Sequence, residues 1–145
     1  MSYAHTKHLL ALVRQPSHYL GCEVNACHKD SGAVALRILL AFPDLYEIGM
    51  SYHGLQILYH VLNRRADISA ERVFAPAPDM ETLIGDSGEP LRSLESGTPA
   101  RDFEIIGFSL LYELSFTNVL AMLGLAGIPF FSADRDRSHP LVIAG

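Results

Sequence analysis

The sequence has only two cysteines, Cys22 and Cys27, among its 145 residues. An iron–sulfur cluster that needs three or four cysteines of one chain is therefore excluded here. An odd separation on a predicted strand sends the two thiols to opposite faces, so we expect both to be free in a reducing, cytoplasmic setting. The sequence also lacks an apolar run of the ~18 residues that a membrane span needs, and it has no signal-peptide cleavage pattern.

Positive charge is scarce as well. The formal net charge is −5 and the pI is about 5.7, which argues against a broad nucleic-acid surface. There is no internal repeat, no Walker loop, no dinucleotide fingerprint, and no Ser-His-Asp or Cys-His grouping. His53 and His60 lie on one predicted helix, about 10 Å apart by helical rise, which is too far for two ligands of one metal ion. The sequence predicts no metal site and no catalytic residue.

What remains is the composition of a folded globular chain, with 49% hydrophobic and 19% charged residues. An apolar run from Val34 to Phe42 predicts a strand. A loop from Pro43 to Ser51 follows, and helical spacing then runs from about Met50 to Arg65. Strand, loop and helix form the first half of a βαβ unit. Further elements are expected as helical turns at 9–14, a helix at 78–85, strands at 70–75, 91–94 and 103–111, a helix at 114–126, and a strand at 140–144.

The alternation of strands and helices predicts an α/β fold of the flavodoxin-like, doubly wound type, with a mainly parallel sheet. Residues 22–28 alternate roughly and precede a turn cluster at 29–32, so we expect an antiparallel N-terminal hairpin at a sheet edge. Residues 1–20 are taken as an N-terminal extension and 21–145 as the domain. Because the last apolar strand has nothing after it to cover it, we expect a domain cut from a longer chain.

Ligands of open α/β sheets bind over the carboxyl ends of the strands, so the first loop is the first candidate site. Asp44 and Glu47 either bind a ribose, an amide or a basic partner, or they cap backbone amides. Tyr46 either stacks on a flat ligand or packs on its own helix, and Gly49 allows a tight turn or a close backbone approach. At the end of the second buried strand, Ser109 either contacts a nucleotide tail or caps a helix.

The motifs at these positions resemble those of cobalamin-binding domains. Such domains carry Asp-x-His-x-x-Gly after the first strand, Ser-x-Leu after a later strand and Gly-Gly after the next; here DLYEIG stands at 44–49, SLL at 109–111 and a glycine at 145. Tyr46 replaces the cobalt-ligating histidine, and a protonated phenol is a poor ligand, which leaves shape-based binding of the corrin. The resemblance implies cofactor-binding roles for Pro43, Asp44, Tyr46, Glu47, Gly49, Ser109, Leu111 and Gly145.

Longer blocks narrow the resemblance. The stretches FPDLYEIGMSYHGLQILYHVLNRR at 42–65 and FEIIGFSLLYELSFTNVLAMLGLAGIP at 103–129 look like the N-terminal region of a family of large radical S-adenosylmethionine proteins. That family has a cobalamin-binding-like domain in front of its radical domain. The resemblance implies a downstream domain that binds S-adenosylmethionine and a 4Fe–4S cluster, because the three-cysteine motif is absent from these 145 residues.

Three functions follow as hypotheses. The chain is an accessory domain that positions cobalamin, another ligand or a substrate for the downstream domain, or it is a docking module for RNA or another macromolecule without a small ligand. A receiver-like signalling domain is disfavoured because Ser109 stands where the phospho-accepting aspartate is needed. A deep, partly apolar cleft at the strand ends favours the first hypothesis, and a filled surface favours the second. Both require the exits near Asp44 and Ser109 to face one hollow.

Overall fold

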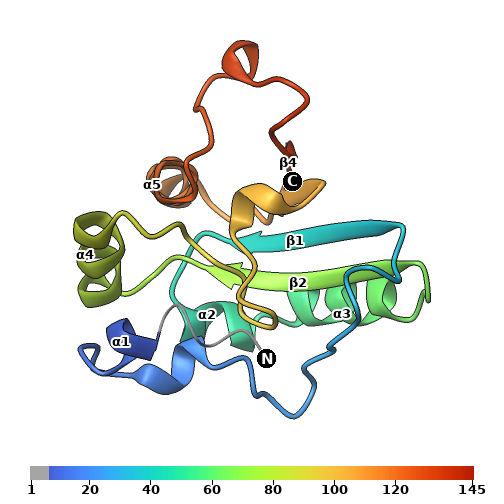
Figure 1. Ribbon diagram of the computed structural model, residues 1–145, viewed down its shortest axis with the longest axis horizontal. Coiled ribbons are helices and arrows are strands. Elements are labelled where there is room, and N and C mark those ends of the chain that lie inside the picture. Colours follow the sequence, from blue (N-terminus) through green and yellow to red (C-terminus); the bar gives the residue numbers. More distant parts are fainter. Residues whose placement is uncertain (1–6) are drawn as a thin grey trace.

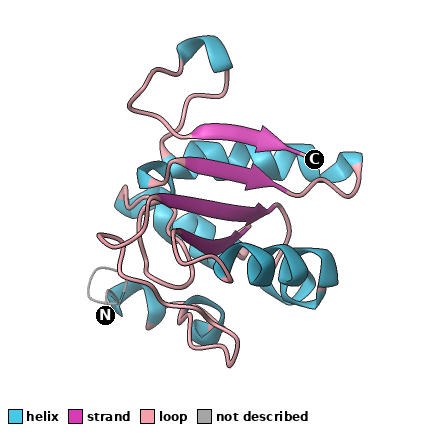
Figure 2. Ribbon diagram, turned by 90° about the vertical axis from the view of Figure 1, so that its right-hand side faces the viewer, coloured by secondary structure: helices cyan, strands magenta, loops and turns pink. Residues whose placement is uncertain are grey.

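The computed structural model describes residues 7–145. Four strands form one sheet in the order β2-β1-β3-β4, and every neighbouring pair is parallel. Figure 2 shows all four strands pointing the same way. The flavodoxin-like, doubly wound prediction is therefore confirmed. The strands are β1 (Leu36–Phe42), β2 (Ile68–Phe74), β3 (Ile105–Phe108) and β4 (Leu141–Ala144).

The apolar run of β1 is continuous because helices cover both of its faces. Leu39 and Ala41 point into a core under the later helices, whereas Leu40 and Phe42 point into a second core on the opposite face. All four side chains are at most 3% exposed. A strand buried on both sides does not alternate between apolar and polar residues, and this is why the sequence run was easy to recognise.

The helices form two layers around the sheet (Figure 1). From β1 the chain continues to β2 on one side of it, and then returns past β1 to β3 and β4 on the other side. Because each crossover is right-handed, this reversal places the helices on opposite faces of the sheet. One layer contains α2 (Tyr46–Ser51) and α3 (His53–Asn63), and the other contains α4 (Pro78–Ser87) and α5 (Phe116–Ala126). Both α4 and α5 end at a left-handed glycine, Gly88 and Gly127, each with φ of 69°.

The predicted antiparallel hairpin is wrong. Residues 21–35 form no strand and instead run along α3 as a loop. The backbone N–H of Cys27 donates to the hydroxyl of Tyr59 over 2.7 Å, and the Lys29 ammonium donates to the carbonyls of Asn63 and Ile68. The polar side chains at 22–28 contact helices instead of alternating on a strand: Asn25 donates to Gln56 of α3 over 3.1 Å, and Glu23 accepts from Tyr46 of α2 over 2.8 Å.

The short strand predicted at 91–94 is also wrong. The segment has one isolated antiparallel bridge, between Arg92 and Pro99. The segment also contacts the outer edge of β2, where the backbone N–H of Leu94 donates to the carbonyl of Arg72 over 2.7 Å. An irregular segment thus covers one edge of the sheet. Among residues 7–145, β4 at the other edge has β3 as its single strand neighbour.

The first loop is shorter than predicted, because α2 already begins at Tyr46. Ser51 ends α2, and its hydroxyl donates back to the carbonyl of Glu47, so it caps no helix start. In the second half, β3 is shorter than the predicted strand at 103–111, and a 3-10 turn (Glu113–Ser115) precedes α5. Of the helical turns predicted at 9–14, residues 9 and 10 are helical within α1 (Lys7–Leu10), and residues 11–14 are turns and bends. Helix α4 extends past the predicted Gly85.

Both cysteines are free, as predicted, although neither lies on a strand. Within residues 7–145, no helix has the length and apolar character to cross a membrane. Leu9 and Val13 near the chain start are buried in the same core as Met80 and Ile84 of α4. The part of the chain at residues 9–19 therefore contributes to the main core.

Candidate functional site

The carboxyl ends of β1 and β3 lie side by side, as the site hypothesis requires. Ala41 pairs with Phe108, and the backbone N–H of Ser109 donates to the Ala41 carbonyl over 3.0 Å. Beyond the strands, the hydroxyl of Tyr112 donates to Oδ2 of Asp44 over 2.5 Å. This hydrogen bond joins the two exit loops, so the exits share one rim of the sheet.

Further hydrogen bonds bind the rim together. The side-chain amide of Asn118 on α5 donates to the carbonyl of buried Pro43 over 2.9 Å. Gly145 donates to Phe108, and its carbonyl accepts from Leu110 over 2.9 Å. Part of the predicted set is thus gathered at this carboxyl rim, namely Pro43, Asp44, Ser109, Leu111 and Gly145.

The crevice between the two exits is almost filled. It is lined by Asp44 and Tyr112 among others, and its volume is only about 10 Å³. A single water needs about 10–15 Å³ by this measure, so the crevice admits one water at most. The side chains of the chain itself occupy the place where a doubly wound fold usually binds its ligand.

A larger hollow lies beside this crevice, between the start of α4 and α5. Its volume is about 230 Å³, and its two charged lining residues are Asp44 and Glu81. Ligand pockets usually measure about 300–1,000 Å³, so this hollow suits a small group. Its lining carries the amide of Asn118 and no basic side chain.

The charge at the carboxyl rim is negative. Asp44 and Glu113 both lie on the exit loops, and Glu81 lies in the first turn of α4. The hydrogen bond to Asp44 raises the pKa of the exposed Tyr112 phenol, with a smaller contribution from burial. Tyr112 therefore stays protonated as the donor at neutral pH, and the rim offers carboxylates to whatever approaches it.

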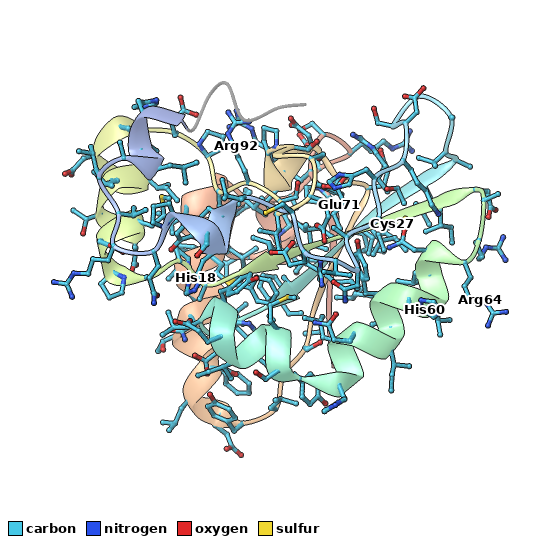
Figure 3. All side chains as sticks on the ribbon, turned by 90° about the horizontal axis from the view of Figure 1, so that it is seen from below. His18, Cys27, His60, Arg64, Glu71 and Arg92 are labelled. Atoms are coloured by element: carbon cyan, nitrogen blue, oxygen red, sulfur yellow. The ribbon has the colours of Figure 1, made fainter. Side chains whose placement is uncertain are left out.

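The other predicted residues lie elsewhere, on α2. The hydroxyl of Tyr46 donates to Oε1 of Glu23 over 2.8 Å, and its ring stacks on His18 with a centroid distance of 4.4 Å. Figure 3 labels His18 beside α2. Burial, reinforced by the bond to Glu23 and its charge, raises the pKa of Tyr46 to about 12. Tyr46 packs within the domain and is not free to stack on a ligand.

Glu47 and Gly49 have different environments on the same helix. Glu47 is half exposed, with Oε1 3.8 Å from Nδ1 of His18. Gly49 is buried, and a Cβ atom added to it would lie 2.3 Å from the ring of Phe74. Of the two roles predicted for Gly49, close backbone approach is the one the structure bears out, and its φ is not positive.

The sequence reasoning missed a buried network around Arg72 of β2. Its guanidinium is fully buried; Nε donates to Oε1 of Glu95 over 2.7 Å, and the group lies 4.2 Å above the ring of Tyr59. Nη2 lies 3.8 Å from Oε2 of Glu23, and neither atom has a hydrogen-bond partner among the described residues. The sequence holds one indication of this network: two adjacent charged residues, Glu71 and Arg72, stand inside an apolar strand.

The residues present do not fit a bound corrin. Tyr46, at the position of the missing histidine, is engaged by Glu23, the Asp44 carboxylate is engaged by Tyr112, and the crevice between the exits is nearly filled. Nor is there a metal centre: within residues 7–145 no group of three or more histidine, cysteine or acidic side chains is arranged to hold an ion. His60 and Arg64 belong to α3 and its C-cap and are solvent-exposed (Figure 3).

Residues 54–145, more than half of the chain, match a protein family described as "Radical SAM proteins, N-terminal". No curated protein and no solved structure matched the chain.

Proposed function

Since the chain belongs to the family of N-terminal regions of radical SAM proteins, we propose that it is an accessory docking and substrate-presenting domain for a radical SAM domain of the same polypeptide. In this proposal the downstream domain holds S-adenosylmethionine and the 4Fe–4S cluster, which supply the radical chemistry. The chain described here has two cysteines and therefore too few thiolates for that cluster.

The observation that carries the proposal is the sealed crevice at the carboxyl rim. The bond from Tyr112 to Asp44 joins the two exit loops, and about 10 Å³ remains between them. A small-molecule site at this position needs an open, concave pocket. A filled rim instead presents a continuous surface. Such a surface suits contact with another part of a protein better than enclosure of a small ligand.

The charge of the rim favours a basic protein surface over RNA as its partner. Asp44, Glu81 and Glu113 are all acidic, and phosphate groups would be repelled by them. Complementary potentials speed encounter and fix orientation at protein interfaces. The net charge of −5 acts in the same direction.

A second candidate function is the positioning of a small ligand, favoured by the hollow of about 230 Å³ beside Asp44. Two carboxylates and the Asn118 amide suit a small cationic or hydrogen-bonding group. Cobalamin is the least favoured ligand, because a corrin is far larger than the hollow and Tyr46 is not available to it.

Calorimetry of this chain with the separately produced downstream part of the radical SAM protein tests the proposal. Glu113→Lys reverses a charge at the rim, and we expect it to weaken binding about tenfold at low salt. Asp86→Lys, at the far end of α4, makes the same change away from the rim and should have no effect. Equal affinities of the two variants would contradict the proposal.

In a second experiment, the unmodified chain and the Tyr46→His variant are each mixed with cobalamin. Unbound cobalamin is removed by desalting, and the visible spectrum of the protein is recorded. We expect an unchanged spectrum and no retained corrin, also for Tyr46→His, because position 46 is packed against His18 and Glu23. Retained corrin in the unmodified chain would favour the second candidate.

A further inference from the structure

The sheet is covered evenly on one face and unevenly on the other. Under α5, Ile106 and Phe108 of β3 are 2% and 4% exposed. On the opposite face α3 packs on β1 and β2, and the outer strand β4 exposes 61% of Leu141 and 52% of Ile143. Half of one sheet face is therefore bare among the described residues.

The strand register makes this bare area continuous. Ile105 pairs with Leu141, and Gly107 pairs with Ile143. Directly paired residues of neighbouring strands point to the same face, so these four form one apolar floor. Ile38 of β1 pairs with Ile105 on its other side and packs against the core under α3. The floor therefore begins at the edge of the covered area.

One flank of α3 forms a wall beside this floor. Gln56 and Asn63 lie on the flank facing β2, where Asn63 binds the backbone of Ala70 and Gln56 accepts from Arg72. At 100° per residue, Leu58 and Val61 fall on the opposite flank, toward β3. They are 43% and 55% exposed. We call the floor and the wall together the apolar shelf: Leu58, Val61, Ile105, Gly107, Leu141 and Ile143.

The dimensions of the shelf match one helix. Two strands at their spacing of about 4.8 Å span about 10 Å, which is close to the diameter of a helix with its side chains, about 10–12 Å. A helix placed there would lie beside α3 and complete the second layer over the sheet. Six residues are far fewer than the roughly 20–30 residues per side of a stable interface between separate proteins. A second copy of the chain is therefore a poor occupant.

We propose that the apolar shelf seats an amphipathic helix from the downstream part of the same radical SAM polypeptide. The inference rests on the proposed function only in that a downstream part is present. Tethering in one chain gives a high effective concentration, so a small apolar contact suffices to hold the helix. The shelf lies on a sheet face and the acidic rim at the strand ends, so the two contacts are tested separately.

Thiol labelling tests the shelf directly. In a background of Cys22→Ser and Cys27→Ser, Ile143→Cys places one thiol on the floor. His60→Cys serves as the control, because His60 is exposed and lies about 100° around α3 from Val61, on the side away from the shelf. Maleimide labelling is followed by mass spectrometry in the 145-residue chain and in the longer protein. We expect labelling of Ile143→Cys about tenfold slower or more in the longer protein only, and of His60→Cys equally fast in both.

Equal labelling of Ile143→Cys in both proteins would overturn the proposal. Protection that already occurs in the 145-residue chain and grows with its concentration would assign the shelf to a second copy and would also overturn it. Leu141→Cys is a second probe if circular dichroism shows that Ile143→Cys is unfolded. A failure of the Glu113→Lys test with protection at position 143 would reject the rim as a docking surface and leave the helix seat intact.

Discussion

Arg72 shows how far a single residue can depart from what its type suggests. A fully buried guanidinium on an edge strand pays a desolvation cost of several kcal/mol, which is offset here by Glu95, by the Tyr59 ring and by Gln56. The sequence alone marks the residue as unusual, because a charge interrupts an apolar strand. It cannot supply the partners, since they come from a helix and from a segment more than 20 residues further along the chain.

A second ion pair, between Arg37 and Glu104, joins β1 to the residue preceding β3. Burial raises the pKa of the Glu104 carboxyl, but hydrogen bonds from the side chain and backbone of Arg37, together with its charge, outweigh burial and bring the pKa below its ordinary value. An acid with a lowered pKa stabilises the fold above its unfolded pKa of about 4.3, and this stability is lost as the pH falls through the folded pKa.

Glu104→Gln should therefore lower the free energy of unfolding at pH 7 by about 0.5–1 kcal/mol, a modest value because both partners are partly solvated. The difference from the unmodified chain should shrink toward zero as the pH falls below about 4. Urea unfolding of both proteins at pH 7, 5 and 3 measures this difference in the free energy of unfolding. Glu113→Gln, an exposed acid with no ion-pair partner among residues 7–145, is the control. A difference that persists unchanged at pH 3 would refute this account.

At the scale of elements, α2 is the clearest departure from expectation. The sequence predicts a loop at 43–51 because Pro43 and Asp44 end the strand and Gly49 interrupts the helical pattern. The helix forms nonetheless, without a side-chain cap, because Gly49 lets it lie directly on Phe42 and Phe74. Tertiary packing determines whether such a short helix forms, so the local helix propensity of the sequence does not reveal it.

A matched pair of glycine variants separates packing from propensity. Gly49→Ala brings a methyl group within 2.3 Å of Phe74, and we expect a loss of about 1–3 kcal/mol from overpacking. Gly85→Ala lies in α4 with nothing within 4 Å of the new Cβ, and it should gain about 0.5–1 kcal/mol from helix propensity. Chemical denaturation of both variants gives the values. A neutral Gly49→Ala would mean that α2 does not pack closely in solution.

For the whole molecule, the parallel sheet follows from the sequence more readily than the geometry of the site does. The apolar runs at Val34–Phe42 and 103–111 identify central parallel strands, and the exits near Asp44 and Ser109 meet as expected. The closure of the crevice could not be predicted, because it depends on the direction in which the Tyr112 side chain points. Likewise, Tyr46 stands at the histidine position of the motif in the sequence, but its side chain contacts Glu23 and His18.

The bare sheet face has a consequence for the isolated chain. An apolar surface of this kind binds the dye ANS, and Leu141→Lys with Ile143→Lys should reduce the fluorescence of bound dye at least about twofold. The free energy of unfolding should change by less than about 0.5 kcal/mol, since both side chains are already half exposed or more. Leu12→Lys, at an exposed site near α1, should leave the dye signal unchanged. A large loss of stability in the double variant would show that the face is covered in the isolated chain.

The two borders of the sheet are not equivalent. Beside β2, the backbone of Leu94 already occupies the Arg72 carbonyl, so that border cannot accept a further strand without displacing a packed segment. Beside β4, the ladder is open among the described residues. Edge-to-edge association of this chain at high concentration should therefore stop at a dimer that joins two β4 strands, and a charge or a proline introduced into β4 should suppress that dimer where the same change beyond β2 would not.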